Sequence, residues 1–102
     1  MPTRINVIEY VTIANTGNVT DFGNLVVARA EVSGCSSSVR GIIAGGNEST
    51  SVFNKNTIEY VTIATTGNAL DFGDLTQGRD QTAAASSSTR GIIAGGGSTR
   101  TN

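Results

Sequence analysis

A chain of 102 residues with 37% hydrophobic and 15% charged residues provides one small domain, and it is too apolar and weakly charged to be a disordered polyampholyte. Its formal charge of −1 argues against nucleic acid or an anionic membrane as an electrostatic partner, and no apolar run is long enough to span a membrane. The absence of histidine and the presence of a single cysteine, Cys35, exclude Cys/His zinc sites, an internal disulfide and every His-based catalytic dyad or triad.

The chain repeats itself with a period of fifty residues. Residues 6–46 align with residues 56–96, and 26 of these 41 positions are identical. A fixed period of this length indicates a repeat architecture. The sequence therefore predicts a first repeat over residues 1–52 and a second over residues 53–102.

The first half of each copy predicts two strands. "IEYVTIA" (8–14 and 58–64) is rich in β-branched and aromatic residues, and the turn signal "TGN" follows it. The next segment, "VTDFGNL" (19–25) or "ALDFGDL" (69–75), contains a glycine, so a bulge or bend is expected there.

The second half of each copy predicts two more strands. "VSGCSSS" (32–38) and "TAAASSS" (82–88) are built almost entirely from small residues, and Cys35 in the first copy is interpreted as a small buried residue. "RGIIAGG" (40–46 and 90–96) is a short apolar run that ends in a glycine pair. No segment has an amphipathic helical period with caps, so the predicted fold class is all-β.

Four antiparallel strands per fifty residues are what one blade of a β-propeller requires. Small side chains suit the innermost strands, because blades crowd together at the central axis. A β-sandwich made of duplicated hairpins is the alternative.

The repeat also resembles the kelch family, in which an apolar strand ends in a glycine doublet, a tyrosine and an aromatic residue follow, and an arginine precedes the next blade. The matching positions are Gly45 and Gly46 (with Gly95 and Gly96), Tyr10 and Tyr60, Phe22 and Phe72, and Arg29 and Arg79.

One departure from the kelch pattern is that the family usually has tryptophan where this chain has Phe22 and Phe72. The near-identical copies are also similar to the tandem kelch-like repeats of bacteriophage tail-fibre-like proteins. That resemblance implies a virion-associated recognition role with a glycan or a host-surface protein as the partner; without it, the sequence leaves the localisation open.

The phase of the repeat predicts assembly. The chain begins with the third and fourth strands of a blade, completes one whole blade, and ends with the first and second strands of another. We expect the C-terminal half blade of one chain to dock against the N-terminal half blade of the next, which closes a ring of identical chains. Two blades per chain favour a trimer with six blades; a tetramer with eight blades is the alternative.

Candidate binding residues lie in three places. Arg40 and Arg90 precede the "GIIAGG" strand in both copies, where they either line a channel or an anion site or pair with a nearby carboxylate or carbonyl group. The loop 47–56 is the least repeated stretch, and it is either a partner site or only a longer connection. The candidates in this loop and in the "TGN" turns are Asn47, Phe53, Lys55, Asn18 and Asn68.

Catalytic chemistry is not expected. Glu9 and Glu59 stand at equivalent positions of different blades, so they are interpreted as solvated residues on a strand face rather than as a paired acid and base. The "SSS" segments have no histidine base and no lysine at S-x-x-K spacing. "TGNVTDFG", with Asp21 beside Asn18, offers too few oxygen ligands for Ca²⁺. The sequence therefore predicts neither an enzyme, nor a cofactor, nor a metal site.

Two functions remain open. The first is a non-enzymatic, self-assembling β-propeller module with a structural or surface-recognition role, including carbohydrate binding. The second is an engineered or excised fragment that serves to study propeller assembly and evolution and has no ligand of its own.

Overall fold

The computed structural model describes residues 4–48 and 55–97, and within these residues the chain is all-β, as the sequence predicts. The described residues contain no helix, and therefore none that could span a membrane. Each of the eight segments predicted as strands overlaps one strand, and all eight strands are shorter than predicted. The strands are β1 (Val7–Tyr10), β2 (Thr20–Asn24), β3 (Ser33–Ser36), β4 (Arg40–Ala44), β5 (Thr57–Thr62), β6 (Leu70–Asp74), β7 (Ala83–Ser86) and β8 (Gly91–Ala94).

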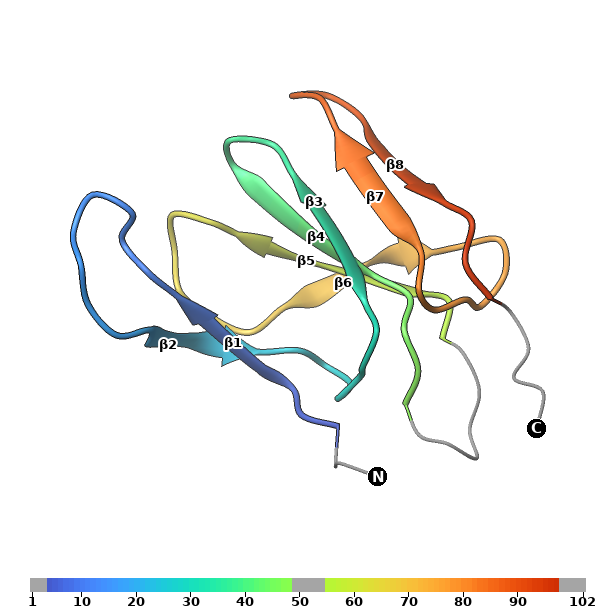
Figure 1. The fold of residues 1–102 in the computed structure, drawn as a ribbon, viewed down its shortest axis with the longest axis horizontal. Helices are drawn as coiled ribbons and strands as arrows, with labels where there is room; N and C mark the ends of the chain where they lie inside the picture. The colour runs from blue at the N-terminus through green and yellow to red at the C-terminus, as the bar shows by residue number, and fades with distance from the viewer. Residues whose placement is uncertain (1–3, 49–54, 98–102) are drawn as a thin grey trace.

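The strands form three antiparallel sheets, in which neighbours in the sheet are neighbours in the chain. β1 pairs with β2, β3 to β6 form a four-stranded sheet in the order β3-β4-β5-β6, and β7 pairs with β8. In Figure 1 the β1–β2 sheet and the β7–β8 sheet lie on opposite sides of the four-stranded sheet. The four-stranded sheet takes two strands from each repeat, so it crosses the predicted repeat boundary at residues 52 and 53.

The predicted irregularity in the "DFG" strand is present as a bulge. Ile8 pairs with Gly23 and Glu9 pairs with Asp21, so Phe22 is an extra residue on β2. The pairing of β5 with β6 breaks at the equivalent place. Because a bulge twists and bends its strand, it turns the aromatic ring toward the preceding strand, where Phe22 meets Tyr10 edge-to-face at a centroid distance of 6.0 Å.

The glycine doublet that ends β4 has a conformational reason. Gly45 and Gly46 adopt φ values of 69° and 93°, and the doublet after β8 repeats this geometry with φ values of 71° and 95°. Side chains with a Cβ rarely adopt this left-handed region, so glycine is favoured at these turns. The turn before β3 and β7 uses the same region without glycine, at Glu31 (φ 59°) and Gln81 (φ 55°).

The interior is small and unusually polar. The only hydrophobic side chains that the described residues bury are Phe22, Ala44 and Ala69. Four polar or charged residues are buried with them: Arg29, Asn47, Glu59 and Asp80. Many large apolar side chains remain exposed, among them Ile13, Val19, Phe72 and Ile92. The core is small and much apolar surface is exposed, which indicates that a single chain leaves part of the apolar faces of its sheets uncovered.

The two small-residue strands are neighbours across the gap between sheets, as expected for strands that crowd together. The hydroxyls of Ser33 on β3 and Thr82 lie 2.6 Å apart. At the other end of these strands, the Ser86 hydroxyl donates to the Ser36 carbonyl at 2.7 Å and accepts from the Ser36 N–H at 3.2 Å. Side chains larger than serine would separate the strands and break these contacts.

Candidate functional site: two open sheet edges

The seam between β4 and β5 is the place where the two repeats join into one sheet. Arg40 pairs with Thr62 at one end of this seam, and Ala44 pairs with Ile58 at the other. β8 is the second copy of β4, and β1 is the first copy of β5. Within the described residues β8 pairs only with β7, and β1 pairs only with β2. We call the paired strands β4 and β5 the closed seam. We call the unpaired edges of β8 and β1, which are the copies of β4 and β5, the open seam.

A buried ion pair lies behind the closed seam. Arg29 Nη2 donates to Glu59 Oε2 at 2.9 Å, and both side chains are almost fully buried, with 0% and 1% exposure. Arg29 Nη1 also donates to the carbonyl oxygens of Gly45, at 2.6 Å, and Thr57, at 3.0 Å. The second carboxylate oxygen of Glu59 accepts from the Val26 N–H at 2.7 Å. This network pairs the two buried charges, leaves only the Arg29 Nε atom without a partner among these atoms, and joins the segment before β3 to the middle of β5.

Burial and the ion pair act on the guanidinium in opposite directions. Removal from water lowers the pKa of Arg29 below its ordinary value, whereas the charge of Glu59 and the hydrogen bond to it raise that pKa. Neither side chain is solvated. The expectation that Glu59 is a solvated strand-face residue is therefore wrong, because the residues before β3 fold over this part of β5 and bring Arg29 onto the carboxylate.

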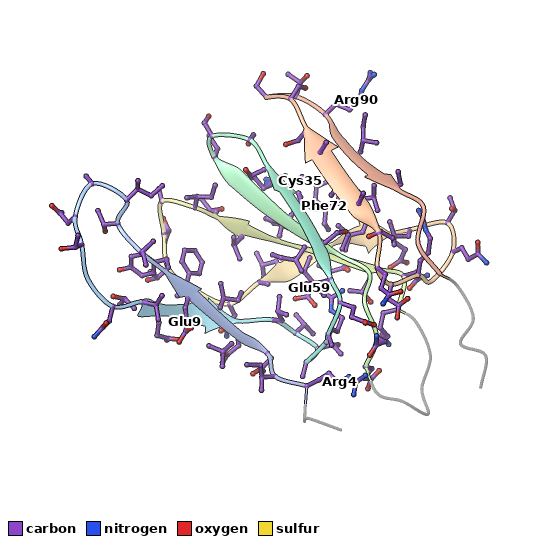
Figure 2. All side chains as sticks on the ribbon, viewed as in Figure 1. Arg4, Glu9, Cys35, Glu59, Phe72 and Arg90 are labelled. Atoms are coloured by element: carbon purple, nitrogen blue, oxygen red, sulfur yellow. The ribbon has the colours of Figure 1, made fainter. Side chains whose placement is uncertain are left out.

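The second copy of this pair is split between the two ends of the molecule. Glu9 is exposed, and its side chain has no ion pair or hydrogen bond among the described residues. Arg79 donates to the Gly95 carbonyl at 2.9 Å, as Arg29 does to Gly45, but no carboxylate among the described residues pairs with it. The Nε atoms of Arg29 and Arg79 are both buried without a hydrogen-bond partner. Figure 2 labels the two glutamates, with Glu59 near the middle of the molecule and Glu9 on the β1–β2 sheet.

The outer strand β2 makes a second kind of contact, with the turn that connects β5 and β6. The Gly67 N–H donates to the Phe22 carbonyl at 2.8 Å, and the Ala69 N–H donates to the Asn24 carbonyl at 2.9 Å. The Asn68 side-chain oxygen accepts from the Asn24 N–H at 3.0 Å. These bonds close the turn over the ring of Phe22, which is 8% exposed.

The same surface is open on β6. Phe72, the copy of Phe22, is 52% exposed. A Cβ added at Gly73 meets nothing within 4 Å, whereas one at Gly23 would collide with the Gly67 carbonyl oxygen. At the opposite end of the molecule, Val19 is 53% exposed, whereas its copy Ala69 is 3% exposed. The second "TGN" turn covers β2, whereas the first "TGN" turn covers no strand among the described residues and β6 is left uncovered.

The hairpins that join β3 to β4 and β7 to β8 bring together two of the predicted site residues. Arg40 and Arg90 line one groove of about 360 Å³ between these hairpins. The Arg40 guanidinium lies over the Tyr60 ring, 4.4 Å from its centroid. Figure 2 labels Arg90 at the hairpin between β7 and β8. Both arginines are exposed, so they are accessible to a ligand.

The structure does not bring the other predicted site residues together with these arginines. Asn68 bonds β2, as described above, whereas Asn18 is exposed. Lys55 forms an ion pair with Glu48 at 3.3 Å. Phe53 lies outside the described residues.

Asn47 is fully buried at 0% exposure, and its side chain is engaged by three others. Arg4 donates to its amide oxygen through Nε at 3.0 Å and Nη2 at 2.6 Å. Its amide nitrogen donates to Glu31 at 2.7 Å and to Asp80 at 2.9 Å. In the chain as described, Asn47 therefore links the two repeats and is not exposed to a ligand.

Sequence reasoning noticed Arg29 and Glu59 separately and missed the pairing between them. Both residues recur with the period of the repeat. The available signal was that the glutamate recurs within the apolar strand "IEYVTIA" and the arginine recurs at a fixed distance from it. Nothing in the sequence shows that one copy of each is buried and the other exposed. Residues 4–48 and 55–97 hold no group of three or more His, Cys, Asp or Glu residues that could bind a metal ion.

Comparison with known proteins adds no family to this description. The sequence matches no model of a known protein family, and no curated protein matches it. The kelch-like resemblance therefore stays a prediction from the sequence. The functional argument therefore rests on the difference between the paired strands β4 and β5 and the unpaired edges of β8 and β1 among the described residues.

Proposed function

We propose that this protein is a non-enzymatic, self-assembling β-propeller module in which β8 of one chain pairs with β1 of the next. The carrying observation is that β4–β5 is closed while the equivalent edges of β8 and β1 are both unpaired. Unpaired strand edges bind other strands through their main-chain N–H and C=O groups. β8 and β1 are copies of β4 and β5, which pair with each other within the chain. The strand that fits the open edge of β8 is therefore β1 of a second copy of this chain.

The closed seam also supplies the register. Ala44 pairs with Ile58, so Ala94 is expected to pair with Ile8 of the next chain. The same shift places Arg79 against Glu9 of the next chain, so the proposed junction would pair and bury these two charges as Arg29 and Glu59 are paired and buried. Intramolecular closure is disfavoured, because the β1–β2 and β7–β8 sheets lie on opposite sides of the four-stranded sheet (Figure 1).

Each junction completes a four-stranded blade, and repetition of one head-to-tail contact closes a ring. A trimer with six blades is the proposed assembly, and a tetramer with eight is the alternative. In both, apolar side chains that are exposed here, such as Phe72 and Val19, become covered. The ring then serves as a scaffold or as a surface that recognises a partner, with phage fibres as the setting suggested by the resemblance.

The register is tested by a cross-link between chains. In a Cys35→Ser background, the paired variant carries Ile8→Cys and Ala94→Cys, and the control carries Asn6→Cys and Ala94→Cys. Cross-strand partners lie close enough for a disulfide, whereas a shift of two residues places them too far apart. Oxidation should give covalent ladders that close at three chains for the paired variant only. Equal cross-linking of both variants, or none, contradicts the proposed junction.

The assembly itself is tested by the native mass of the unmodified chain, measured by light scattering. Three chains support the six-bladed ring, and four support the eight-bladed ring. The Glu9→Gln and Arg79→Gln variants should each shift the mass toward the monomer, because each leaves one buried charge without its partner. A compact monomer at all concentrations refutes the proposal.

A further inference from the structure

We propose that the groove between the two serine-rich hairpins is a binding site for an acidic saccharide, one that carries a carboxylate or a sulfate group. The groove lies within a single chain, so it extends the recognition role proposed above without requiring the ring to close. Its residues come from the β3–β4 hairpin, from the β7–β8 hairpin and, at Phe72, from β6. The volume of about 360 Å³ is suited to one or two sugar rings.

The charge of the groove differs from that of the whole chain. Arg40 and Arg90 both line it, and none of its lining residues is Asp or Glu. The chain as a whole carries −1. Two cations without a neighbouring carboxylate create a locally positive surface on an otherwise weakly acidic protein, which favours one compact anionic group.

The guanidinium groups have donors to spare. Arg40 stacks on Tyr60, a contact that holds the planar group in place without using its N–H donors. Within the described residues, neither Arg40 nor Arg90 makes a side-chain hydrogen bond or an ion pair. A guanidinium with a free N–H fork is the group that binds carboxylate and sulfate oxygens in a bidentate manner.

The hydroxyl groups of the hairpins add directional donors. Six hydroxyl side chains line the groove, five from serine and one from threonine. The Ser37 oxygen accepts from the N–H groups of Val39 and Arg40, at 3.2 and 3.1 Å. Ser87 repeats these bonds in the second hairpin, at 3.3 and 3.2 Å. Because the Ser37 oxygen serves as an acceptor for the turn, its O–H hydrogen can point outward and donate to a ligand. The Ser87 and Thr89 hydroxyls lie 3.5 Å apart, so one of them can donate to the other and the remaining hydrogen is open to a ligand.

Hydroxyl-rich walls favour a sugar over the other source of anionic groups. Sugar hydroxyls both donate and accept, so they match serine and threonine side chains that do the same. Nucleic acid binding depends on several phosphate contacts and a positive field, which a chain of net charge −1 with two groove arginines does not supply. The site therefore fits an acidic sugar better than a strand of RNA or DNA.

Titration of the ¹⁵N-labelled protein with galactose 6-sulfate and with glucuronic acid tests the proposal. Neutral galactose and inorganic sulfate serve as ligand controls. The acidic sugars should shift the resonances of residues 36–40 and 86–91, and galactose should not. Arg90→Gln should weaken binding by about tenfold, the loss expected for charge-assisted hydrogen bonds, and Arg40→Gln should do the same.

Lys55→Gln is the matched control, because it also removes one positive charge but lies outside the groove. It should leave the affinity unchanged. An equal loss in Lys55→Gln and Arg90→Gln, or equal binding of galactose and its sulfate, overturns the site. Tighter binding of a short RNA than of either sugar overturns the ligand class, and binding of inorganic sulfate alone overturns the saccharide. The native mass of each variant separates loss of the groove from loss of assembly.

Discussion

Glu9 and Glu59 stand in the same strand sequence, "IEYVTIA", but in opposite surroundings. Glu59 is fully buried against Arg29, and Glu9 is exposed with no partner among the described residues. The same contrast separates Phe22 from Phe72. The seven residues of "IEYVTIA" are identical in the two copies, so the difference between the glutamates comes from which segments lie beside each copy. β5 pairs with both β4 and β6, whereas β1 pairs only with β2 among the described residues. The turn between β5 and β6 bonds to β2 beside Phe22, whereas no described turn bonds to β6 beside Phe72.

The largest effect is expected from Arg29→Ala in comparison with Arg79→Ala. Removal of Arg29 leaves the buried Glu59 carboxylate without a counter-ion, which should lower the free energy of unfolding by about 3–5 kcal/mol. Within the described residues, the Arg79 side chain has only the Gly95 carbonyl as a partner, so its loss should cost far less while preventing assembly. Urea denaturation at low protein concentration measures both. Equal losses in the two variants would show that the two copies are equivalent.

Phe22→Ala and Phe72→Ala should differ next most. Phe22 is 8% exposed, and removal of a buried phenylalanine costs about 3–5 kcal/mol. Phe72 is 52% exposed, so its truncation should cost about half of that in the single chain, since the cost follows the area removed from water. Thermal and urea unfolding of monomeric samples compare the two. A larger cost for Phe72 would contradict the open state of the β6 surface.

Gly23→Ala and Gly73→Ala sharpen the comparison at a smaller scale. A Cβ at Gly23 would collide with the Gly67 carbonyl oxygen, so this variant should lose about 1–3 kcal/mol. A Cβ at Gly73 meets nothing within 4 Å, so that variant should keep its monomer stability and lose only the ability to form a ring. Unfolding and native mass are measured side by side. If Gly73→Ala assembles normally, the first "TGN" turn of the next chain does not lie against β6 in the ring.

The smallest effect is expected for Ser86→Ala. Its hydroxyl both donates to and accepts from the main chain of Ser36, and loss of these exposed bonds should cost about 1 kcal/mol or less. Ser36→Ala is the matched control, because Ser36 contributes only its main chain to this contact. Its stability should be unchanged. If both variants lose the same amount, the hydroxyl of Ser86 does not join β3 to β7.

The sequence predicted the strands well because their limits are set locally. The "TGN" turns, the glycine doublets and the β-branched runs are all short-range signals, and even the bulge at Phe22 follows from the glycine beside it. The two copies also repeat the left-handed turns at Glu31 and Gln81. Features of this kind need no knowledge of distant residues.

Burial could not be predicted in the same way. Glu59 was interpreted as solvated because a carboxylate in a strand is usually on the water side, and only a residue thirty positions away reverses that. Asn47 was expected in an open loop, yet the side chains that hold it come from Arg4, Glu31 and Asp80. Arg40 and Arg90 share a groove because two hairpins fifty residues apart lie side by side. Each of these depends on packing between sheets.

The position of the open seam within a sheet has a consequence for the variety of chains that can assemble. A seam between strands is held mainly by main-chain N–H and C=O groups, which are the same for every residue except proline. Two chains that differ in their outward side chains, but keep the small residues and the charges of the seam, would therefore be interchangeable neighbours in the proposed ring. The groove residues Arg40 and Arg90 take no part in the charge pair of the seam: Arg40 is the first residue of β4, at one end of the seam, and Arg90 directly precedes β8. Mixed rings could then carry different groove sequences on one common frame.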